Sequence, residues 1–160
     1  MTEKELWAAF CRASGTDAAT PYQAWGFGSA PDLLAALVAL GIKTATASGY
    51  ELYALDPLEP MPQPGDLSVI LDSRENAVCV IRTERVRVLP FCSVDARQAY
   101  KEGEGDRSLA YWRQVHDELF RTEYESCGVV FTENALILCE EFSLLYSLYA
   151  VGTLTDAEAR

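Results

Sequence analysis

A lysine stands where an apolar helix pattern gives way to a strand pattern, in the stretch Gly41–Ser48, GIKTATAS. Lys43 is followed by the hydroxyl groups of Thr44 and Thr46. A lysine held out of water loses its proton more easily and can act as a base toward a hydroxyl or a water. The two-residue period of a strand puts Lys43 and Thr46 on opposite faces, so they meet only if the chain bends between them. The alternative is a solvated lysine near a helix end.

An acidic segment, EGEGD, runs from Glu102 to Asp106. Glycines between acids predict a flexible, negative loop that leads into a helix. Glu102 and Glu104 are the candidates here for proton transfer. The spacing does not match a calcium-binding EF-hand loop. A solvated acidic loop without chemistry is the alternative interpretation.

The single histidine, His116, follows this segment in a helical pattern. Leu109, Trp112, His116 and Phe120 fall on one helix face, with Arg113 at its border. We therefore expect His116 to point inward, either as a core residue or as part of a site. Since no second histidine or paired cysteine has metal-ligand spacing, we expect no metal and no cofactor.

Two further aromatic residues, Trp25 and Phe27, lie in the motif WGFG. Their side chains can stack on a nucleobase, or they can pack a loop against the body of the protein. Both interpretations stay open from the sequence.

The net charge constrains the partners. The chain has 160 residues, with 24 acidic and 13 basic side chains and a formal net charge of −11. Binding to duplex nucleic acid needs a basic face, so the composition favours a free nucleoside, a nucleotide or a short single-stranded RNA. No apolar run reaches about 18 residues, which excludes a membrane span. The charged first residues lack the pattern of a secretory signal, and the five cysteines are scattered, so we expect a cytoplasmic protein with reduced thiols.

The pattern of elements predicts the α+β class. The expected elements are a helix over 2–14, a packed loop over 19–28, a helix over 31–40 closed by Gly41, a strand over 43–48, a helical turn within 49–64, a hairpin of strands over 65–72 and 77–90, helices over 94–101 and 106–122 (the second capped by Asp106), and a last strand over 135–146. We expect one domain, 1–160, with a mixed or mostly antiparallel sheet that can close into a small barrel.

Taken together, these stretches resemble ASCH-domain proteins of the PUA-like superfamily, in particular a longer bacterial branch described as predicted RNA-binding. The resemblance covers about residues 22–146 and leaves the helix over 2–14 and the tail over 147–160 as extensions. The residues that carry it are the motif WGFG at 25–28, GIKTAT at 41–46, PGD at 64–66, EGEGD at 102–106, and Trp112, Arg113 and His116.

The resemblance implies a small β-barrel with surrounding helices, and a cleft where a lysine, a threonine and an acid converge. ASCH domains are viewed as RNA-binding, and some members are hydrolases. Short bacterial relatives remove the acetyl group of N4-acetylcytidine with a lysine, a threonine and a glutamate, and others are described as ribonucleases. By position these residues match Lys43, Thr46 and Glu102, with Glu104 a close second. Short relatives often carry arginine at the position of Ser48.

Two classes of function follow for this chain. In the first, a hydrolase, Lys43 is a base that activates Thr46 or a water against an N-acylated nucleoside amide, and Glu102 or Glu104 passes the proton on. Cleavage of single-stranded RNA is a variant of it. The second class is a non-catalytic reader of RNA or a nucleotide. The residues expected to contact the substrate are Trp25, Phe27, Thr44, Trp112, Arg113 and His116, with Arg113 or a backbone N–H also available to an oxyanion. The sequence does not define the oligomeric state.

Overall fold

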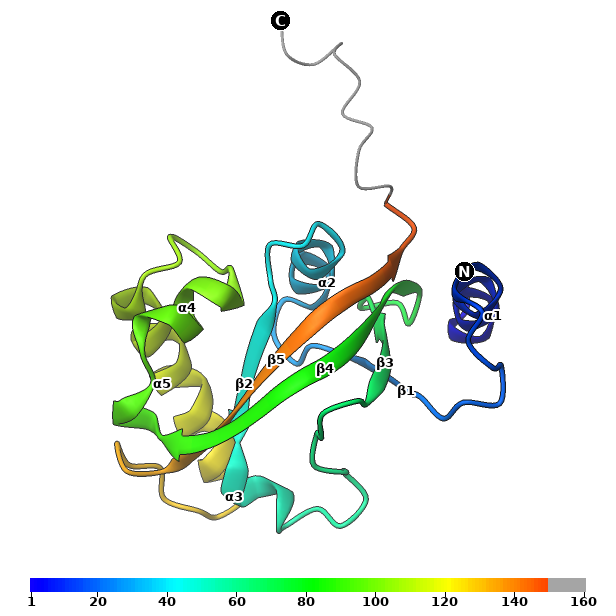
Figure 1. Ribbon diagram of the computed structural model, residues 1–160. Coiled ribbons are helices and arrows are strands. Elements are labelled where there is room, and N and C mark those ends of the chain that lie inside the picture. The colour runs from blue at the N-terminus through cyan, green and yellow to red at the C-terminus, as the bar shows by residue number, and fades with distance from the viewer. Residues whose placement is uncertain (150–160) are drawn as a thin grey trace, which may run out of the picture. The chain divides into compact units, whose positions relative to one another are not determined.

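Five strands form one sheet, in the order β1-β3-β4-β5-β2 (Figure 1). Their bounds are β1 Gln23–Gly26, β2 Ala45–Gly49, β3 Leu67–Leu71, β4 Ala77–Pro90 and β5 Leu136–Ser147. The pair β1–β3 is parallel and the pair β2–β5 is antiparallel. The sheet is therefore mixed, and with five α-helices in the described chain it confirms the predicted α+β class.

The computed structural model describes residues 1–149 of the chain, which form two compact units. Unit 1 contains Met1–Gly41, Leu67–Ile81 and the chain from Leu144 onward. Unit 2 contains Ile42–Asp66 and Arg82–Ser143. Lys43, the acidic segment and His116 consequently all belong to unit 2.

Unit 1 begins with helix α1, Glu3–Ser14, and also contains helix α2, Pro31–Ala39. A capping box starts α1: the Thr2 hydroxyl accepts from the Glu5 backbone N–H, and the Glu5 carboxylate accepts from the Thr2 N–H. The apolar face of α1 packs with strand residues that include Val69 and Val80.

The expected loop over 19–28 is wrong in part, because Gln23–Gly26 forms β1, paired in parallel with β3. Four residues are too few for a strand pattern to show.

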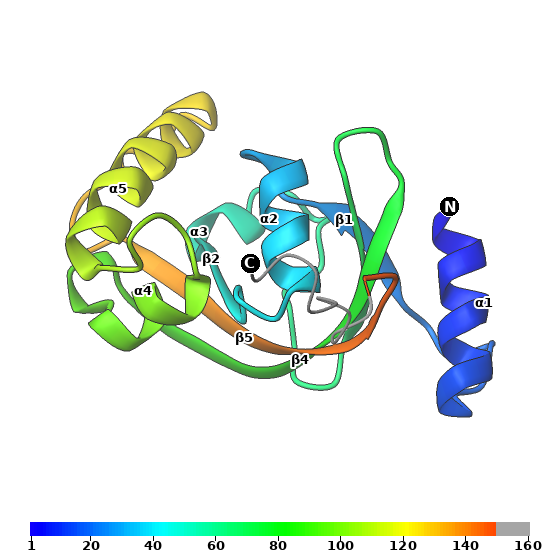
Figure 2. The same cartoon turned by 90° about the horizontal axis from the view of Figure 1, so that it is seen from above.

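Unit 2 is built around helix α5, Leu109–Ser126, which buries Trp112, His116 and Phe120 as predicted, and Tyr124 in addition. Leu109, the fourth residue of the predicted face, is partly buried against the same core. This face packs with Ile137 and Cys139 of β5. Helix α4, Ala96–Glu102, lies side by side with α5 (Figures 1 and 2) and also packs on β2. The short helices α3, Tyr50–Tyr53, and η1, Phe91–Ser93, complete the unit.

Several element ends differ from the sequence prediction. The predicted hairpin forms, as β3 and β4. Helix α2 ends at Ala39 rather than reaching 40, and β2 begins at Ala45, so Lys43 precedes the strand. Helix α5 is capped by the hydroxyl of Ser108, which accepts from the Tyr111 N–H, instead of by Asp106. The Asp106 carboxylate accepts from the Ser108 N–H and so supports the cap from outside the helix. The tail beyond residue 149 lies outside the described residues.

Two other expectations concern the whole described chain. No helix within residues 1–149 is both long and apolar enough to cross a membrane. The five cysteines are free thiols; Cys11, Cys79 and Cys139 are buried, whereas Cys92 and Cys127 are exposed.

Candidate functional site

Lys43 lies two residues before β2, and its side chain is buried with carboxylates around it. The residue is 2% exposed. Its Nζ is 3.1 Å from Glu104 Oε2 and 3.6 Å from Glu102 Oε1, and it donates to the Glu102 carbonyl over 3.3 Å. A buried ammonium is costly unless it is paired, and this one is paired twice. The solvated-lysine interpretation is therefore wrong.

The end of α4 delivers both glutamates to Lys43. The Thr44 N–H donates to the Lys101 carbonyl over 2.7 Å, which holds the start of β2 against the last turn of α4. Gly103 ends the helix with φ +71°, and a Cβ there would lie 2.7 Å from the Ile42 carbonyl oxygen. Only glycine allows both this left-handed conformation and this close approach.

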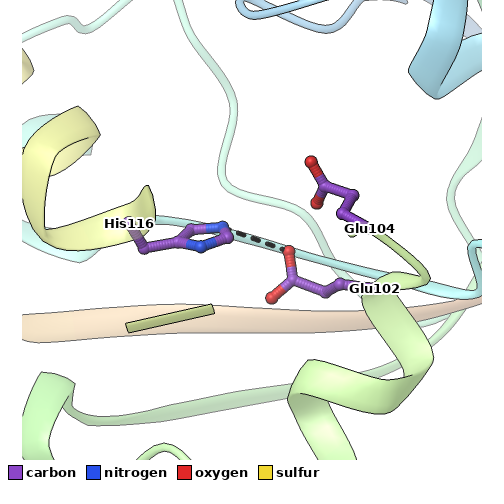
Figure 3. A group of neighbouring side chains, drawn as sticks. All are labelled: Glu102, Glu104 and His116. Atoms are coloured by element: carbon purple, nitrogen blue, oxygen red, sulfur yellow. Dashed lines mark ion pairs between the residues drawn. The ribbon is translucent and has the colours of Figure 1, made fainter. Parts of the chain in front are cut away.

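Glu102 is fixed by groups from both helices. Its Oε2 accepts from the indole N–H of Trp112 and from Gln98 Nε2, the second over 3.3 Å. Its Oε1 lies 3.4 Å from His116 Nε2, the contact drawn in Figure 3. Gln98 and Glu102 are four residues apart on α4, and Trp112 and His116 are four apart on α5, so each pair shares a helix face. The residue is 1% exposed and has little freedom to move.

The electrostatics of this cluster favour charged forms of Glu102 and His116. Burial alone raises the pKa of Glu102, but the hydrogen bond from His116 and the charge of Lys43 outweigh it, so the pKa is lowered. Burial alone lowers the pKa of His116, but the hydrogen bond and charge of Glu102 and the Trp112 carbonyl raise it overall. That carbonyl lies 2.9 Å from His116 Nδ1. Because Glu102 Oε1 and His116 Nε2 are 3.4 Å apart, the two charged side chains form an ion pair.

Glu104 differs from Glu102 in its access to solvent. Its side chain is 21% exposed and its hydrogen bond is with Lys43. The loop that carries it is held by Arg107, which donates to the Tyr100 carbonyl over 2.9 Å and lies 3.7 Å above the Tyr100 ring. These contacts anchor the loop to the last turn of α4, and Glu104 is the member of the cluster that solvent or a ligand can reach.

Glu102, Glu104 and His116 also have the donor set of a cation site (Figure 3). One ligand atom from each lies within 4.8 Å of the other two. The ammonium of Lys43 already contacts both carboxylates, however. A metal ion at this position would have to displace the ammonium from both carboxylates.

Thr46 approaches the cluster through its backbone. Its carbonyl accepts from Gln98 Nε2 over 3.2 Å. In the sheet Thr46 is paired with Glu140, whereas the next pair, Ala47 and Cys139, packs toward the helices. Successive side chains alternate between faces, so the Thr46 hydroxyl points to the sheet face away from α4 and α5. Direct action of Lys43 on the Thr46 hydroxyl stays a prediction.

The substrate-contacting residues expected in unit 2 have different surroundings. Trp112 is in the core, with His116 stacked at 4.2 Å and Phe91 at 5.5 Å between ring centroids. Both of its faces are covered, so the expected stacking on a base is not supported. Arg113 is exposed and donates to the carbonyls of Cys92 and Val94, so it is not brought into the cluster. The Thr44 hydroxyl donates to the Lys101 carbonyl over 3.4 Å.

Trp25 and Phe27 belong to unit 1. Their rings meet edge to face, with centroids 5.1 Å apart, and both are partly exposed. Stacking of a base on either residue stays a prediction.

Three polar residues of unit 2 were missed from the sequence. Gln98 bridges Thr46 and Glu102, and within the described chain its Oε1 is buried without a partner. Glu140 and Thr83 are buried together on the Thr46 face. The spacing of four residues between Gln98 and Glu102 was the available signal for the first. No local sequence pattern shows which of Glu140 and Glu141 faces Thr46. Only the pairing register of β2 with β5 decides this.

The mixed five-stranded sheet with its surrounding helices is a PUA-like fold of the α+β class. An ASCH domain family model matches residues 23–146, so this chain belongs to the ASCH family. The chain is similar to the crystal structure of an ASCH domain from Lactobacillus crispatus JV V101, with 27% identity and a TM-score of 0.81 over 91% of this chain and 96% of that one. A protein from Enterococcus faecalis V583 is also similar, with 27% identity and a TM-score of 0.78 over 91% and 94%. No curated protein matches.

Proposed function

We propose that this protein binds a nucleoside or a short single-stranded RNA and hydrolyses an N-acylated nucleoside amide at the Lys43 cluster. One observation carries the proposal: Lys43 is buried against two glutamates, one of them fixed and one accessible. An ion pair with a purely structural role does not need one fixed and one accessible glutamate. ASCH membership is consistent with nucleic acid or nucleotide binding.

The reaction follows from the pairing of Lys43 with Glu104, 3.1 Å apart. In the proposed step, Lys43 passes a proton to Glu104 and its neutral amine takes a proton from water. The remaining hydroxide attacks the amide carbonyl. The C–N bond breaks as Glu104 donates its proton to the leaving nucleoside amine, which restores the ammonium and the carboxylate. Glu102 positions Lys43, and Thr46 contacts the substrate.

A turnover assay tests this function. Purified protein is incubated with N-acylated nucleosides and with a short single-stranded RNA, and products are separated by chromatography. The Lys43→Met variant keeps the length of the side chain and removes the amine. We expect the wild type to release the nucleoside and the acid, and the variant to lose at least 100-fold in rate, within the range that positioned acid–base groups contribute.

Lys101→Met is the matched control. Lys101 is also paired with a glutamate, Glu141, over 3.0 Å, but its side chain is 26% exposed and it stands outside the cluster. It should keep wild-type turnover. RNA cleavage lost in Lys43→Met would replace the amidohydrolase with a nuclease, and nucleoside binding without turnover would leave a reader.

A further inference from the structure

Glu140 is a buried carboxyl group that the proposed reaction does not use. It is 6% exposed and lies on β5. Within residues 1–149 its hydrogen bonding consists of one contact, from the Thr83 hydroxyl to Oε1 over 2.7 Å. Lysine, arginine and histidine residues of the described chain form no ion pair with it.

Such a group is expensive to bury. Burial raises the pKa of Glu140, the Thr83 hydrogen bond opposes this, and the charge of Asp66 adds to it. A carboxyl group with one neutral partner costs more than an apolar side chain of the same size. Groups of this kind are concentrated at binding sites, where a ligand supplies the missing partners.

The surroundings of Glu140 are polar on one sheet face. Thr46 is directly opposite it across β2 and β5, so the two side chains point the same way. Ser48 shares that face, and its hydroxyl is hydrogen-bonded to the Tyr53 hydroxyl at 2.8 Å. Thr46 and Ser48 are partly exposed, so this face meets solvent at its β2 side.

We propose that Glu140, with Thr83 and Thr46, binds the hydrogen-bonding edge of a nucleobase. The inference rests on the proposed function, because the ligand it assigns to Glu140 is the nucleoside proposed there. A carboxylic acid held by Thr83 at Oε1 can donate from Oε2 to an acceptor and accept at Oε1 from an adjacent N–H. Each base presents such a donor–acceptor pair on its Watson–Crick edge.

Thr46 connects this site to the catalytic cluster. Its hydroxyl lies on the Glu140 face, and its carbonyl is linked through Gln98 to Glu102. A nucleoside in contact with the Thr46 hydroxyl therefore lies on the Glu140 face, and the Thr46 backbone and Gln98 connect that face to the cluster.

Binding measurements by calorimetry test the site. Each nucleoside that binds the wild type is compared with the analogue lacking one hydrogen-bonding atom of that edge: 3-deazacytidine, 3-methyluridine or 1-deazaadenosine. We expect the analogue to bind about 5- to 150-fold more weakly, the range of a bidentate base contact. Glu140→Met should erase this difference. Glu140→Gln, which still has a donor and an acceptor, should retain most of it.

Glu141→Met is the matched control, since Glu141 faces the other way and pairs with Lys101. It should keep the wild-type discrimination.

A thermal melt of each variant accompanies the measurement, and Glu140→Met should melt no lower than the wild type. If Glu140→Met binds nucleosides as tightly as the wild type and discriminates against the analogues equally well, the Glu140 site is wrong but the proposed function stands. A lower melting temperature with unchanged discrimination would make Glu140 structural. Failure of the wild type to bind any nucleoside would overturn the proposed function and this site with it.

Discussion

Glu102 and Glu104 are two residues apart, yet they are held very differently. The Glu102 carboxylate has contacts from Trp112, Gln98 and His116 as well as Lys43, whereas within residues 1–149 the Glu104 carboxylate is hydrogen-bonded to Lys43 alone. A carboxylate locked in this way can orient Lys43 but is slow to exchange partners. The exposed one can exchange protons with a substrate.

This difference predicts opposite phenotypes for the two glutamine variants. Glu102→Gln removes a buried charge and leaves Lys43 and His116 without full compensation, so it should destabilise the protein by about 3–5 kcal/mol. Glu104→Gln should cost about 1 kcal/mol, as for a partly exposed pair, while abolishing turnover. Urea denaturation gives the stabilities, and the nucleoside assay gives the rates. Equal destabilisation by both substitutions would contradict the assignment of roles.

The pH dependence of stability follows from the same pair. The lowered pKa of Glu102 contributes stability above the unfolded value of about 4.3, and this is lost as pH falls through the folded pKa. The raised pKa of His116 contributes stability below the unfolded value of about 6.5, and this is lost as pH rises through the folded pKa. Both contributions are therefore present between about 4.3 and 6.5.

His116 is the single histidine of the chain, so its NMR titration can be assigned without ambiguity. We expect its pKa above about 6.5 in the wild type and lower in Glu102→Gln, where the charge opposite Nε2 is gone. A wild-type value below about 6.5, or no change in the variant, would mean that the pair is not ionised as described.

At the scale of elements, the contact between the end of α4 and the chain before β2 decides the site geometry. Gly103 and Gly128 both have φ +71°, but a Cβ at Gly103 would lie 2.7 Å from the Ile42 carbonyl, whereas Gly128 faces open space. Alanine at either position should cost about 1–2 kcal/mol for the left-handed conformation. Gly103→Ala should cost a further 1–3 kcal/mol or so for the forced shift, and reduce turnover. Chemical denaturation and the nucleoside assay measure both effects. Identical results for the two glycines would show that the close approach does not matter.

The sequence predicts these elements well where a pattern extends over several turns or residues. The helix face with Trp112 and His116, the hairpin and the first helix are confirmed. The errors are local: β1 is too short to show alternation, and Ser108 competes with Asp106 as cap because either side chain can accept at a helix start.

The site was predictable in part for the same reason. Lys43 and the two glutamates are conspicuous in type and spacing, whereas their mutual contact depends on where β2 begins. Gln98 and Glu140 act through tertiary contacts, from the packing of α4 on β2 and from the register of β2 with β5. A single sequence contains neither of these.

At the scale of the whole molecule, the net charge of −11 sets how nucleic acid can approach. A typical nucleic-acid-binding protein loses affinity as salt rises, because its basic face releases counterions from the phosphates. This chain lacks the excess of basic residues for that effect, and its negative field repels a polyanion unless salt screens it. The buried Lys43 is already compensated by two carboxylates, so it does not reverse the field.

The salt dependence of binding should therefore have an unusual sign. Between 50 and 200 mM salt, the affinity for an uncharged nucleoside should change by less than about twofold, because no phosphate is neutralised. The affinity for a single-stranded RNA hexamer should stay level or increase over the same range, since salt screens the repulsion. Fluorescence anisotropy with a labelled hexamer, competed by the nucleoside, measures both. A steep fall of hexamer affinity with rising salt would instead reveal a local basic face. Single-stranded RNA rather than a single nucleoside would then be the ligand.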